Sequence, residues 1–289
     1  MKKLVITSFL LSSMIFGGWA QDNTNSFDKK FRFGIRVAPQ PTWIKSKDKN
    51  ATGAGMGLGF GFGLITEFKL SDIVRLYTGI GGDFENGTIN YKYDLANQFS
   101  VTYFTDKDGE LVELKNGMDT SEIFSQNITG YGAVTKRKIK TTHVTIPLTL
   151  KMLTQEYGGF RYFAQFGADI AIRTKIKADD EYSALFRNRN SSLLTSSSTN
   201  SDLDLKKDAS LLPIRIGLNV GLGTEYRIAG TTSLMFSINY FSSFTNLMRS
   251  TSKYTITNAS IDSNGKFNFT FLKQNLVQNA IRINVGILF

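Results

Sequence analysis

The sequence predicts an all-β fold: a transmembrane antiparallel β-barrel of eight strands with long extracellular loops, with ten strands as the alternative. Three observations predict it. An export signal stands at the N-terminus, apolar and polar residues alternate in repeated segments, and short and long connections follow one another in turn. A soluble β-sandwich, which also uses alternating strands, is the runner-up fold.

The first twenty residues carry the export signal. Lys2 and Lys3 give a positive start, Leu4–Phe16 is an apolar run broken only by hydroxyl side chains, and Ala20 ends a small-residue cleavage site. A single membrane anchor fits less well, because this run is shorter than the roughly 20 residues that a spanning helix needs. We therefore expect residues 1–20 to be a signal peptide cleaved after Ala20, 21–30 a short periplasmic segment, and 31–289 a barrel in the bacterial outer membrane.

The composition limits the chemistry of the exported chain. The full sequence of 289 residues contains no cysteine and one histidine, so no disulfide, thiol chemistry or zinc site is expected. The net charge is +10, and loss of Lys2 and Lys3 with no acidic residue leaves +8. An exported basic protein meets phosphate mainly on lipid headgroups, so lipid rather than nucleic acid is the expected partner.

Period-two alternation is clearest in Met56–Phe68. Large apolar side chains occupy the even positions from 56 to 64, and glycines occupy positions 57, 59, 61 and 63. An empty second face implies that bulky side chains from neighbouring strands need the room, as they do in a narrow barrel. Segments of about ten alternating residues are typical of transmembrane barrels. Seven further segments make eight: Phe31–Val37, Val74–Phe84, Val144–Met152, Phe160–Ile176, Ile214–Ile228, Leu234–Phe244 and Val277–Phe289.

The connections between these segments alternate in length. Bacterial outer-membrane barrels have short periplasmic turns and long outer loops. The even-numbered connections are short and the odd-numbered ones are long, as expected of a barrel whose N-terminus is periplasmic. The short connections are Lys69–Asp72, Leu153–Gly159 and Ala229–Thr232, and the long ones are Lys45–Gly55, Asn86–Thr135, Lys177–Leu212 and Thr245–Leu276.

The long connections carry patterns of their own. Val101–Leu114 is predicted as a hairpin around Asp106–Gly109, and Tyr254–Leu272 as another around Gly265. Either hairpin projects above the membrane or adds a strand pair, which would make ten strands. Ala178–Ser210 is rich in serine, asparagine and aspartate and is predicted to be mobile.

Aromatic residues lie near the ends of the predicted strands, where interfacial girdles form. Phe289 ends the last strand at the periplasmic side. A terminal aromatic residue there resembles the signal read by the barrel-assembly machinery, which is therefore an expected partner. The predicted girdle residues are Trp43, Phe68, Phe84, Phe160, Tyr226 and Phe244.

One pair of residues invites a catalytic interpretation. His143 and Thr145 stand two apart, and a histidine with a nearby hydroxyl resembles the outer-membrane phospholipase arrangement. In that arrangement the hydroxyl is a serine and the pair faces lipid, whereas here the residues are expected to face the lumen. A nucleophile also needs a base and an orienting partner, and none can be assigned. The sequence therefore predicts no catalytic residue, no cofactor, no metal site and no enzyme activity.

Charged residues recur on the face predicted to line the lumen. The interior of an eight-stranded barrel is just filled by side chains, so these charges are expected to form a paired plug and not an open pore. The predicted luminal charge network comprises Arg36, Glu67, Arg75, Asp83, Glu85, Lys151, Arg161, Asp169, Arg173, Arg215, Glu225, Arg227 and Arg282.

A lysine cluster precedes the fourth predicted strand. Lys136, Lys138 and Lys140 share the lipid-facing parity with Met152. Twelve residues at about 3.3 Å and a 45° tilt place Lys140 roughly 28 Å above Met152, near the top of a ~25 Å apolar band. Phosphates of lipopolysaccharide lie at that height, so these lysines are candidate phosphate contacts. An ordinary charged rim is the alternative.

Four segments in order resemble PorT-type outer-membrane β-barrel proteins of the Bacteroidota. They are KFRFGIRVAPQPTWIK at Lys30–Lys45, GFGFGLITEFKLSD at Gly59–Asp72, HVTIPLTLKM at His143–Met152 and RYFAQFGADIAIRTK at Arg161–Lys175. The resemblance covers nearly all of the chain after residue 20 except the outer loops. It implies the barrel class and, from the namesake of that family, an accessory role in type IX protein secretion. The long loops at Asn86–Thr135 and Lys177–Leu212 depart from the compact members.

Two classes of function therefore stay open. The first is a non-catalytic accessory or scaffold barrel that contacts envelope or secretion-system proteins. The second is a small stabilising, lipopolysaccharide-binding or adhesive barrel of the OmpX kind. A narrow pore and a lipid-modifying enzyme are minor alternatives.

Overall fold

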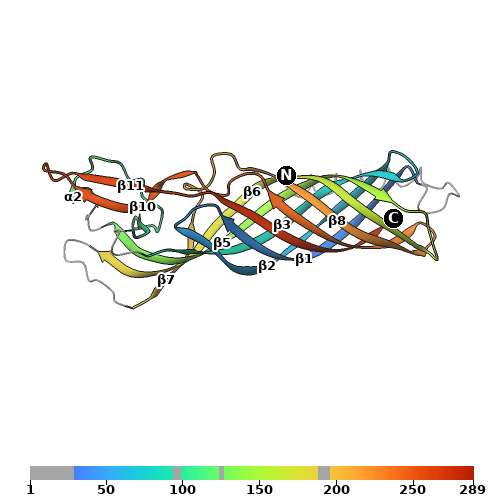
Figure 1. Ribbon diagram of the computed structural model, residues 1–289, viewed down its shortest axis with the longest axis horizontal. Coiled ribbons are helices and arrows are strands. Elements are labelled where there is room, and N and C mark those ends of the chain that lie inside the picture. Colours follow the sequence, from blue (N-terminus) through green and yellow to red (C-terminus); the bar gives the residue numbers. More distant parts are fainter. Residues whose placement is uncertain (1–28, 94–98, 124–126, 188–195) are drawn as a thin grey trace, which may run out of the picture.

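The computed structural model describes residues 29–93, 99–123, 127–187 and 196–289, so the predicted signal peptide and its cleavage site lie outside the described residues. Within these ranges no helix is long and apolar enough to cross a membrane. The chain forms twelve strands and one short helix there (Figure 1). In order, the elements are β1 Phe31–Ser46, β2 Ala51–Lys69, β3 Val74–Tyr91, β4 Thr102–Thr105, α2 Thr120–Ile123, β5 Thr129–Leu153, β6 Phe160–Arg187, β7 Ser198–Asp204, β8 Ile214–Ala229, β9 Thr232–Ser243, β10 Thr251–Ile261, β11 Phe267–Lys273 and β12 Leu276–Leu288.

Eight of these strands pair into a closed ring. Its order is β1, β2, β3, β5, β6, β8, β9 and β12, and β12 returns to β1. All of these pairings are antiparallel; Val37 of β1, for example, stands opposite Phe62 on one side and Val285 on the other. The prediction of an all-β antiparallel barrel is confirmed. The expected count of eight describes this ring, whereas the described residues contain twelve strands.

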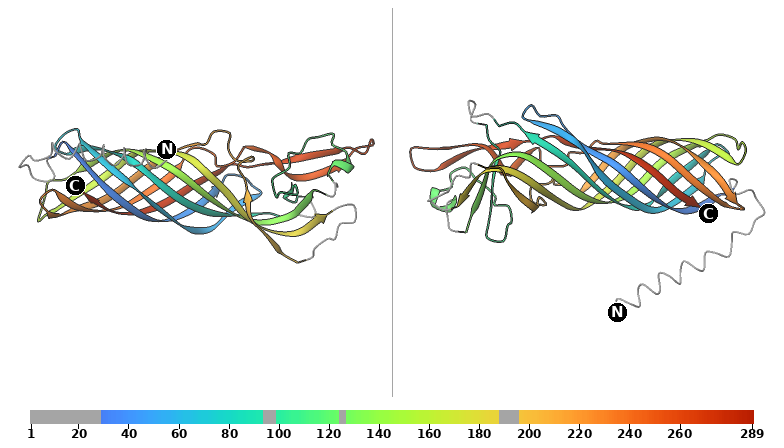
Figure 2. Two further views of the ribbon diagram at one scale, coloured as in Figure 1. Left: turned by 180° about the vertical axis from the view of Figure 1, so that it is seen from behind. Right: turned by 90° about the horizontal axis from the view of Figure 1, so that it is seen from below.

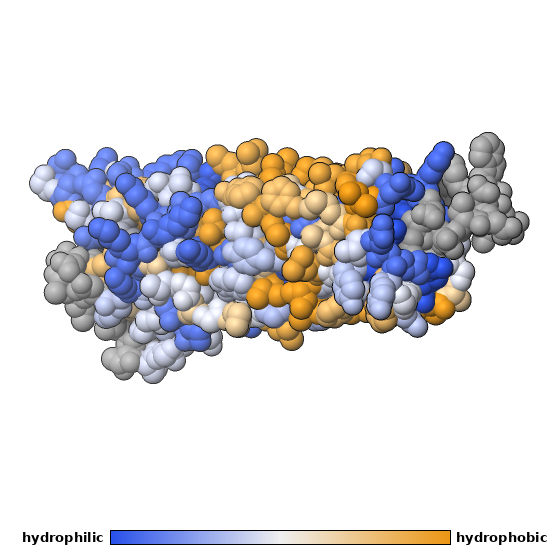
Figure 3. Space-filling view, turned by 45° about the vertical axis from the view of Figure 1, so that its right-hand side comes forward, coloured by the Kyte–Doolittle hydropathy of each residue, from blue (hydrophilic) through white to orange (hydrophobic). Residues whose placement is uncertain are grey.

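Side chains alternate between the two faces of the ring. On β1, Phe33 and Ile35 are each about half exposed, at 55% and 54%, while Arg32 and Arg36, which flank them in the sequence, are buried. The even-numbered Phe60, together with its apolar neighbours on β2, likewise faces outward. Figure 3 shows the result as an apolar belt between two hydrophilic ends. Such a belt is the surface that a bilayer requires of a spanning barrel.

Short turns gather at the end of the ring where β12 finishes, opposite the end that carries β10 and β11 (Figure 2). They are residues 70–73, 154–159 and 230–231, close to the predicted positions. At the opposite end the predicted loops are wrong in extent. Residues 47–50 alone join β1 to β2, and β3, β5 and β6 continue into Asn86–Thr135 and Lys177–Leu212. The reason is pairing: the upper halves of these strands bond to one another over their whole length.

A second sheet region, here called the platform, extends beyond the ring. It consists of β4, β7, β10 and β11 together with the upper ends of β5 and β6, in the order β11, β10, β4, β5, β6, β7. The segment Thr245–Leu276, predicted as a loop, contains the β10–β11 hairpin. Asp262 closes its turn by accepting the backbone N–H groups of Asn264 and Lys266, each at 2.9 Å. These strands add to the platform and leave the ring at eight.

The other predicted loop features follow the same logic. In Val101–Leu114 a tight turn brings Leu111 opposite Thr105, as expected of a hairpin. Ala178–Ser210 was predicted to be mobile, but β6 runs to Arg187 and β7 pairs with it; residues 188–195 lie outside the described ranges. Charged and hydroxyl side chains dominate the sequence of β7, so it resembles a loop although it pairs with the neighbouring β6.

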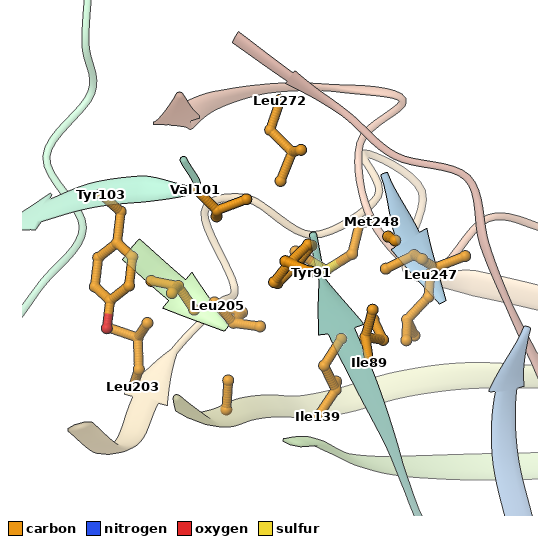
Figure 4. Close-up of a cluster of buried hydrophobic side chains, with 14 of the residues drawn as sticks. Ile89, Tyr91, Val101, Tyr103, Ile139, Leu203, Leu205, Leu247, Met248 and Leu272 are labelled. Carbon is orange, nitrogen blue, oxygen red and sulfur yellow. The ribbon is translucent and has the colours of Figure 1, made fainter. Parts of the chain in front are cut away.

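Apolar side chains fill the junction between ring and platform. Figure 4 shows part of this cluster, which draws residues from both the strands and the connections. Ile89 and Ile139 come from the upper ends of β3 and β5, and Leu247 and Met248 come from the connection after β9. All four are at most 5% exposed. The upper end of the barrel interior is therefore closed by packed apolar side chains.

Two neighbouring glycines provide a test of how tightly the ring is packed. A Cβ on Gly63 would lie 2.6 Å from the carbonyl oxygen of Ile80, whereas a Cβ on Gly82 would meet only the ring of Phe62, at 3.5 Å. We expect Gly63→Ala to lower the free energy of unfolding by about 1–3 kcal/mol and Gly82→Ala to change it little. Urea unfolding in lipid vesicles, followed by Trp43 fluorescence, measures both. Equal losses would contradict this packing.

Candidate functional site

The lumen nearest the short turns contains a ring of four buried charges. Arg32 contacts Glu67 at 3.3 Å and Glu225 at 2.8 Å, and Lys151 contacts Glu67 at 2.6 Å and also binds Glu225. Arg32 further donates to the Ser233 hydroxyl at 3.1 Å. The residues come from β1, β2, β5, β8 and β9, so this layer joins opposite walls of the barrel. Two cations and two anions are thus in direct contact, and the buried Arg75 lies close enough to interact with both carboxylates.

A neutral layer of amides lies farther along the lumen. Asn239 donates to Gln165 and to Asn219, each at 2.9 Å, and Asn284 donates to Asn239 at 3.0 Å. Arg36 closes the layer by donating to the Asn284 side-chain oxygen at 2.9 Å. Asn219, Asn239 and Asn284 both donate and accept, so the network satisfies most of its buried polar groups, although the Gln165 side-chain NH2 has no partner among the described residues.

Arg282 is the centre of a third layer. Its guanidinium binds Asp169 and lies 3.6 Å from Asp83 and 3.4 Å from Glu85. Arg215 binds the same Glu85. Both guanidiniums lie over the ring of Phe241, at 4.4 and 4.7 Å from its centroid. Three carboxylates thus face two arginines in this layer.

The three layers fill the lumen. On the platform side of the Arg282 layer, His143, Arg173, Arg215 and Gln278 border a cavity of about 10 Å³, room for about one water molecule. The apolar cluster at the base of the platform follows. The described side chains therefore form a plug of charges and amides, topped by an apolar core.

The predicted luminal residues separate into two groups. Ten of the thirteen are at most 7% exposed, as a plug requires. Arg161, Arg173 and Arg227 have inward parity but lie at the ends and are only partly buried. There Arg161 binds the Thr154 carbonyl and Arg227 the Glu156 carboxylate in a short turn. At the platform end, Arg173 binds the carbonyls of Ser210 and Leu247 in the long connections. The buried residues are Arg36, Glu67, Arg75, Asp83, Glu85, Lys151, Asp169, Arg215, Glu225 and Arg282.

The sequence analysis did not identify one residue and one ion pair among the buried charges. Arg32 is fully buried and has the same parity as Arg36, so the alternation of β1 already contained the signal. The second is the pair of Arg137 and Asp180, which stand opposite one another on β5 and β6 with two hydrogen bonds of 2.8 and 2.7 Å. Asp180 fell in a segment predicted to be a loop, so its partner strand was hidden.

His143 and Thr145 lie inside the ring, as their parity predicted. His143 is 1% exposed, with its Nδ1 3.6 Å from Glu85, and Thr145 is fully buried. Neither residue faces the lipid belt. Among the described residues, no three histidine or acidic side chains gather as metal ligands would.

Buried polar groups also tie the connections to the platform. Asp208, between β7 and β8, accepts hydrogen bonds from Ser252 at 2.7 Å and Thr255 at 3.4 Å on β10. Burial raises the pKa of its carboxyl above the ordinary value, despite these hydrogen bonds. Arg137 packs beneath it with Tyr103 over its guanidinium at 5.5 Å. The platform is thus anchored by specific contacts.

A family model described as "Outer membrane protein beta-barrel domain" matches residues 19–248. The chain belongs to this family. The ring described above is therefore an outer-membrane barrel, and the bacterial outer membrane is its location.

Individual proteins resemble this outer-membrane barrel only distantly. Neisserial surface protein A has 11% identity and a TM-score of 0.34, with 90% of this chain and 96% of that one covered. OprG from Pseudomonas aeruginosa has 12% identity and a TM-score of 0.36, covering 90% and 94%. Ail from Yersinia pestis has 10% identity and a TM-score of 0.29, covering 90% and 100%. A search of curated proteins gives no match. Values this low say nothing about activity.

The predicted lysine cluster of the outer-membrane barrel faces carboxylates of β6. Lys136 binds Glu181 at 2.8 Å, Lys140 binds Asp179 at 2.6 Å, and Lys138 stands opposite Asp179 in the strand register. Two of the three ammonium groups are therefore already paired within the protein. Phosphate contact by this cluster stays a prediction.

The four-charge layer gives a stability prediction. Lys151→Met leaves Glu67 and Glu225 facing each other with Arg32 in direct contact and the buried Arg75 nearby, so we expect a loss of about 3–5 kcal/mol in the free energy of unfolding. The double variant Lys151→Met with Glu225→Gln restores the charge balance and should recover part of that loss. Urea unfolding in vesicles measures both, and a double variant with fully additive losses would contradict the coupling.

The raised pKa of Asp208 gives a prediction for pH dependence. The folded state holds this proton more tightly than the unfolded state, so the contribution to stability is full below the unfolded-state pKa of about 4. It is lost as pH rises through the higher folded-state value. Asp208→Asn keeps a hydrogen-bond acceptor without the charge, so its stability relative to wild type should increase over that pH range. Unfolding midpoints measured from acid to neutral pH test this, and a constant difference would count against it.

Proposed function

We propose that this protein is a non-catalytic outer-membrane barrel that acts as an accessory or scaffold component of the cell envelope. The sealed ring anchors the chain in the membrane, and the platform is the part that contacts other proteins. We assign these two roles because the surfaces differ: the surface is apolar around the ring and polar around the platform (Figure 3).

The continuity of β5 and β6 carries this proposal. These strands have 25 and 28 residues, whereas about 9–11 residues suffice for a tilted strand to cross the bilayer. More than half of each strand therefore stands outside the hydrocarbon region and forms the centre of the platform. A surface built on extensions of the membrane-spanning strands is held more rigidly than one built from loops. Such rigidity favours a role in binding other proteins.

The lumen supports a role without transport or catalysis. Charges and amides fill it in three layers, so a solute has no open path through the described side chains. His143 and Thr145 lie within this filled interior, where a lipid substrate on the outer wall does not meet them. A narrow pore and a lipid-modifying enzyme therefore receive little support from the geometry.

The sequence resemblance to PorT-type proteins supports a narrower version of the proposal, an accessory role in type IX protein secretion. The segments that carry it, such as His143–Met152, belong to the ring strands and not to the platform. The second candidate, a stabilising, lipopolysaccharide-binding or adhesive barrel of the OmpX kind, is supported by the charged side chains that β5 and β6 present above the apolar belt.

A clean deletion in the source bacterium separates the two candidates. If the protein serves type IX secretion, quantitative proteomics should show loss from the medium of proteins that share a C-terminal sorting domain, and their accumulation in the periplasm. Complementation with the full chain should restore export, while a chain with residues 251–273 replaced by a short turn should insert without restoring it. An unchanged secretome would reject an essential secretion role and favour the second candidate.

A further inference from the structure

A hollow of about 440 Å³ lies on the outer wall where the ring meets the platform. Its lining divides by chemistry. Leu58, Phe60 and Phe84, from β2 and β3, form an apolar flank, and Lys140, Lys175 and Lys177, from β5 and β6, form a basic flank. These six residues are here called the wall groove.

Strand register fixes the arrangement of the wall groove. Phe60 stands opposite Phe84, Phe84 opposite Thr142, and Thr142 opposite Lys175, so one row crosses four neighbouring strands. In the next row toward the platform, Lys140 stands opposite Lys177. The apolar flank and the three ammonium groups therefore lie side by side on one continuous surface.

The apolar flank belongs to the lipid-facing belt. Leu58 is 76% exposed, and Phe60 and Phe84 are each 46% exposed, values that an aqueous surface rarely gives to three adjacent large apolar side chains. The hollow lies toward the platform end of that belt, where acyl chains give way to headgroups. A ligand that fills it must be apolar on one side and anionic on the other.

The basic flank keeps positive charge in excess. Asp179 lies 2.6 Å from the Lys140 ammonium, and Asp202 lies 3.7 Å from the ammonium groups of both Lys140 and Lys177. Lys175 makes no ion pair with any part of the chain that the structure describes. Three cations thus face two carboxylates, and the Asp202 side chain is 64% exposed and shared between two lysines.

We propose that the wall groove binds a phosphorylated lipid of the outer leaflet. Its phosphate lies between Lys175 and Lys177 with Lys140 at its edge, and its acyl chains lie along Leu58, Phe60 and Phe84. Charge-assisted hydrogen bonds from ammonium groups suit phosphate oxygens, and each basic residue at a membrane surface changes the affinity for anionic lipid about fivefold. Lys136, which is held by Glu181 higher on the wall, has no part in this site.

The ligand class is tested with purified folded protein in detergent, by native mass spectrometry with three probes: diphosphorylated lipid A, the same lipid without phosphates, and inorganic phosphate. We expect saturable binding of the diphosphorylated lipid alone. Equal binding of the dephosphorylated lipid would show that the basic flank does not recognise phosphate and would overturn the proposal. Equal binding of inorganic phosphate would show that the apolar flank does not recognise acyl chains and would also overturn it.

Matched variants test the residues. Lys175→Gln with Lys177→Gln should weaken binding of diphosphorylated lipid A by roughly 25-fold. Lys136→Gln with Lys138→Gln is the control of equal charge change and should leave it unaltered. Asp202→Asn removes a competing anion and should strengthen binding severalfold, a gain that damage to the fold does not produce. Heat-modifiable electrophoretic mobility verifies folding. Weakening by the control pair alone, or no change with Asp202→Asn, would overturn the assignment.

Discussion

The pairing of β12 with β1 is the constraint on which the rest of the molecule depends. A bilayer core offers no water to unpaired backbone N–H and C=O groups, so a sheet can cross it only when its last edge meets its first. Here Val37 has a partner strand on each side, Phe62 in β2 and Val285 in β12, and no ring strand keeps an open edge at that level. Closure also divides all side chains between a lipid face and an enclosed face.

Eight strands make the enclosed face narrow, and that dictates its chemistry. Side chains just fill such an interior, so little water remains to solvate charge. Arg32 and Lys151 therefore need Glu67 and Glu225, and each of the four reaches two partners of opposite sign. Removing one member deprives both of its partners of a direct counter-ion, which is why the layers act as units.

Period-two alternation made the ring strands and most of the plug predictable. Phe60 and Phe62 could be assigned to lipid, and Glu67 and Asp83 to the lumen, because parity alone decides the face. Much of the platform could not be predicted in this way, because apolar and polar residues do not alternate in most of its strands. Segments such as Lys177–Arg187 carry charge on both faces, so they look like loop until the partner strand is known. The contacts of Asp180 with Arg137 and of Asp208 with Ser252 depend on long-range register, which no local pattern contains.

The interior changes character at one level, and this links the plug to the platform. Along β1, the inward positions run from Arg32 through Arg36 and Gln40 to Ile44, from charged to apolar. Ile89 and Ile139 make the same change on β3 and β5. Below this level polar partners span the lumen, and above it apolar side chains pack against the connections and around the buried Arg137–Asp180 pair. Because the upper strands gain a core of their own there, they continue as sheet beyond the membrane, and the platform stands on the barrel as part of one packed structure.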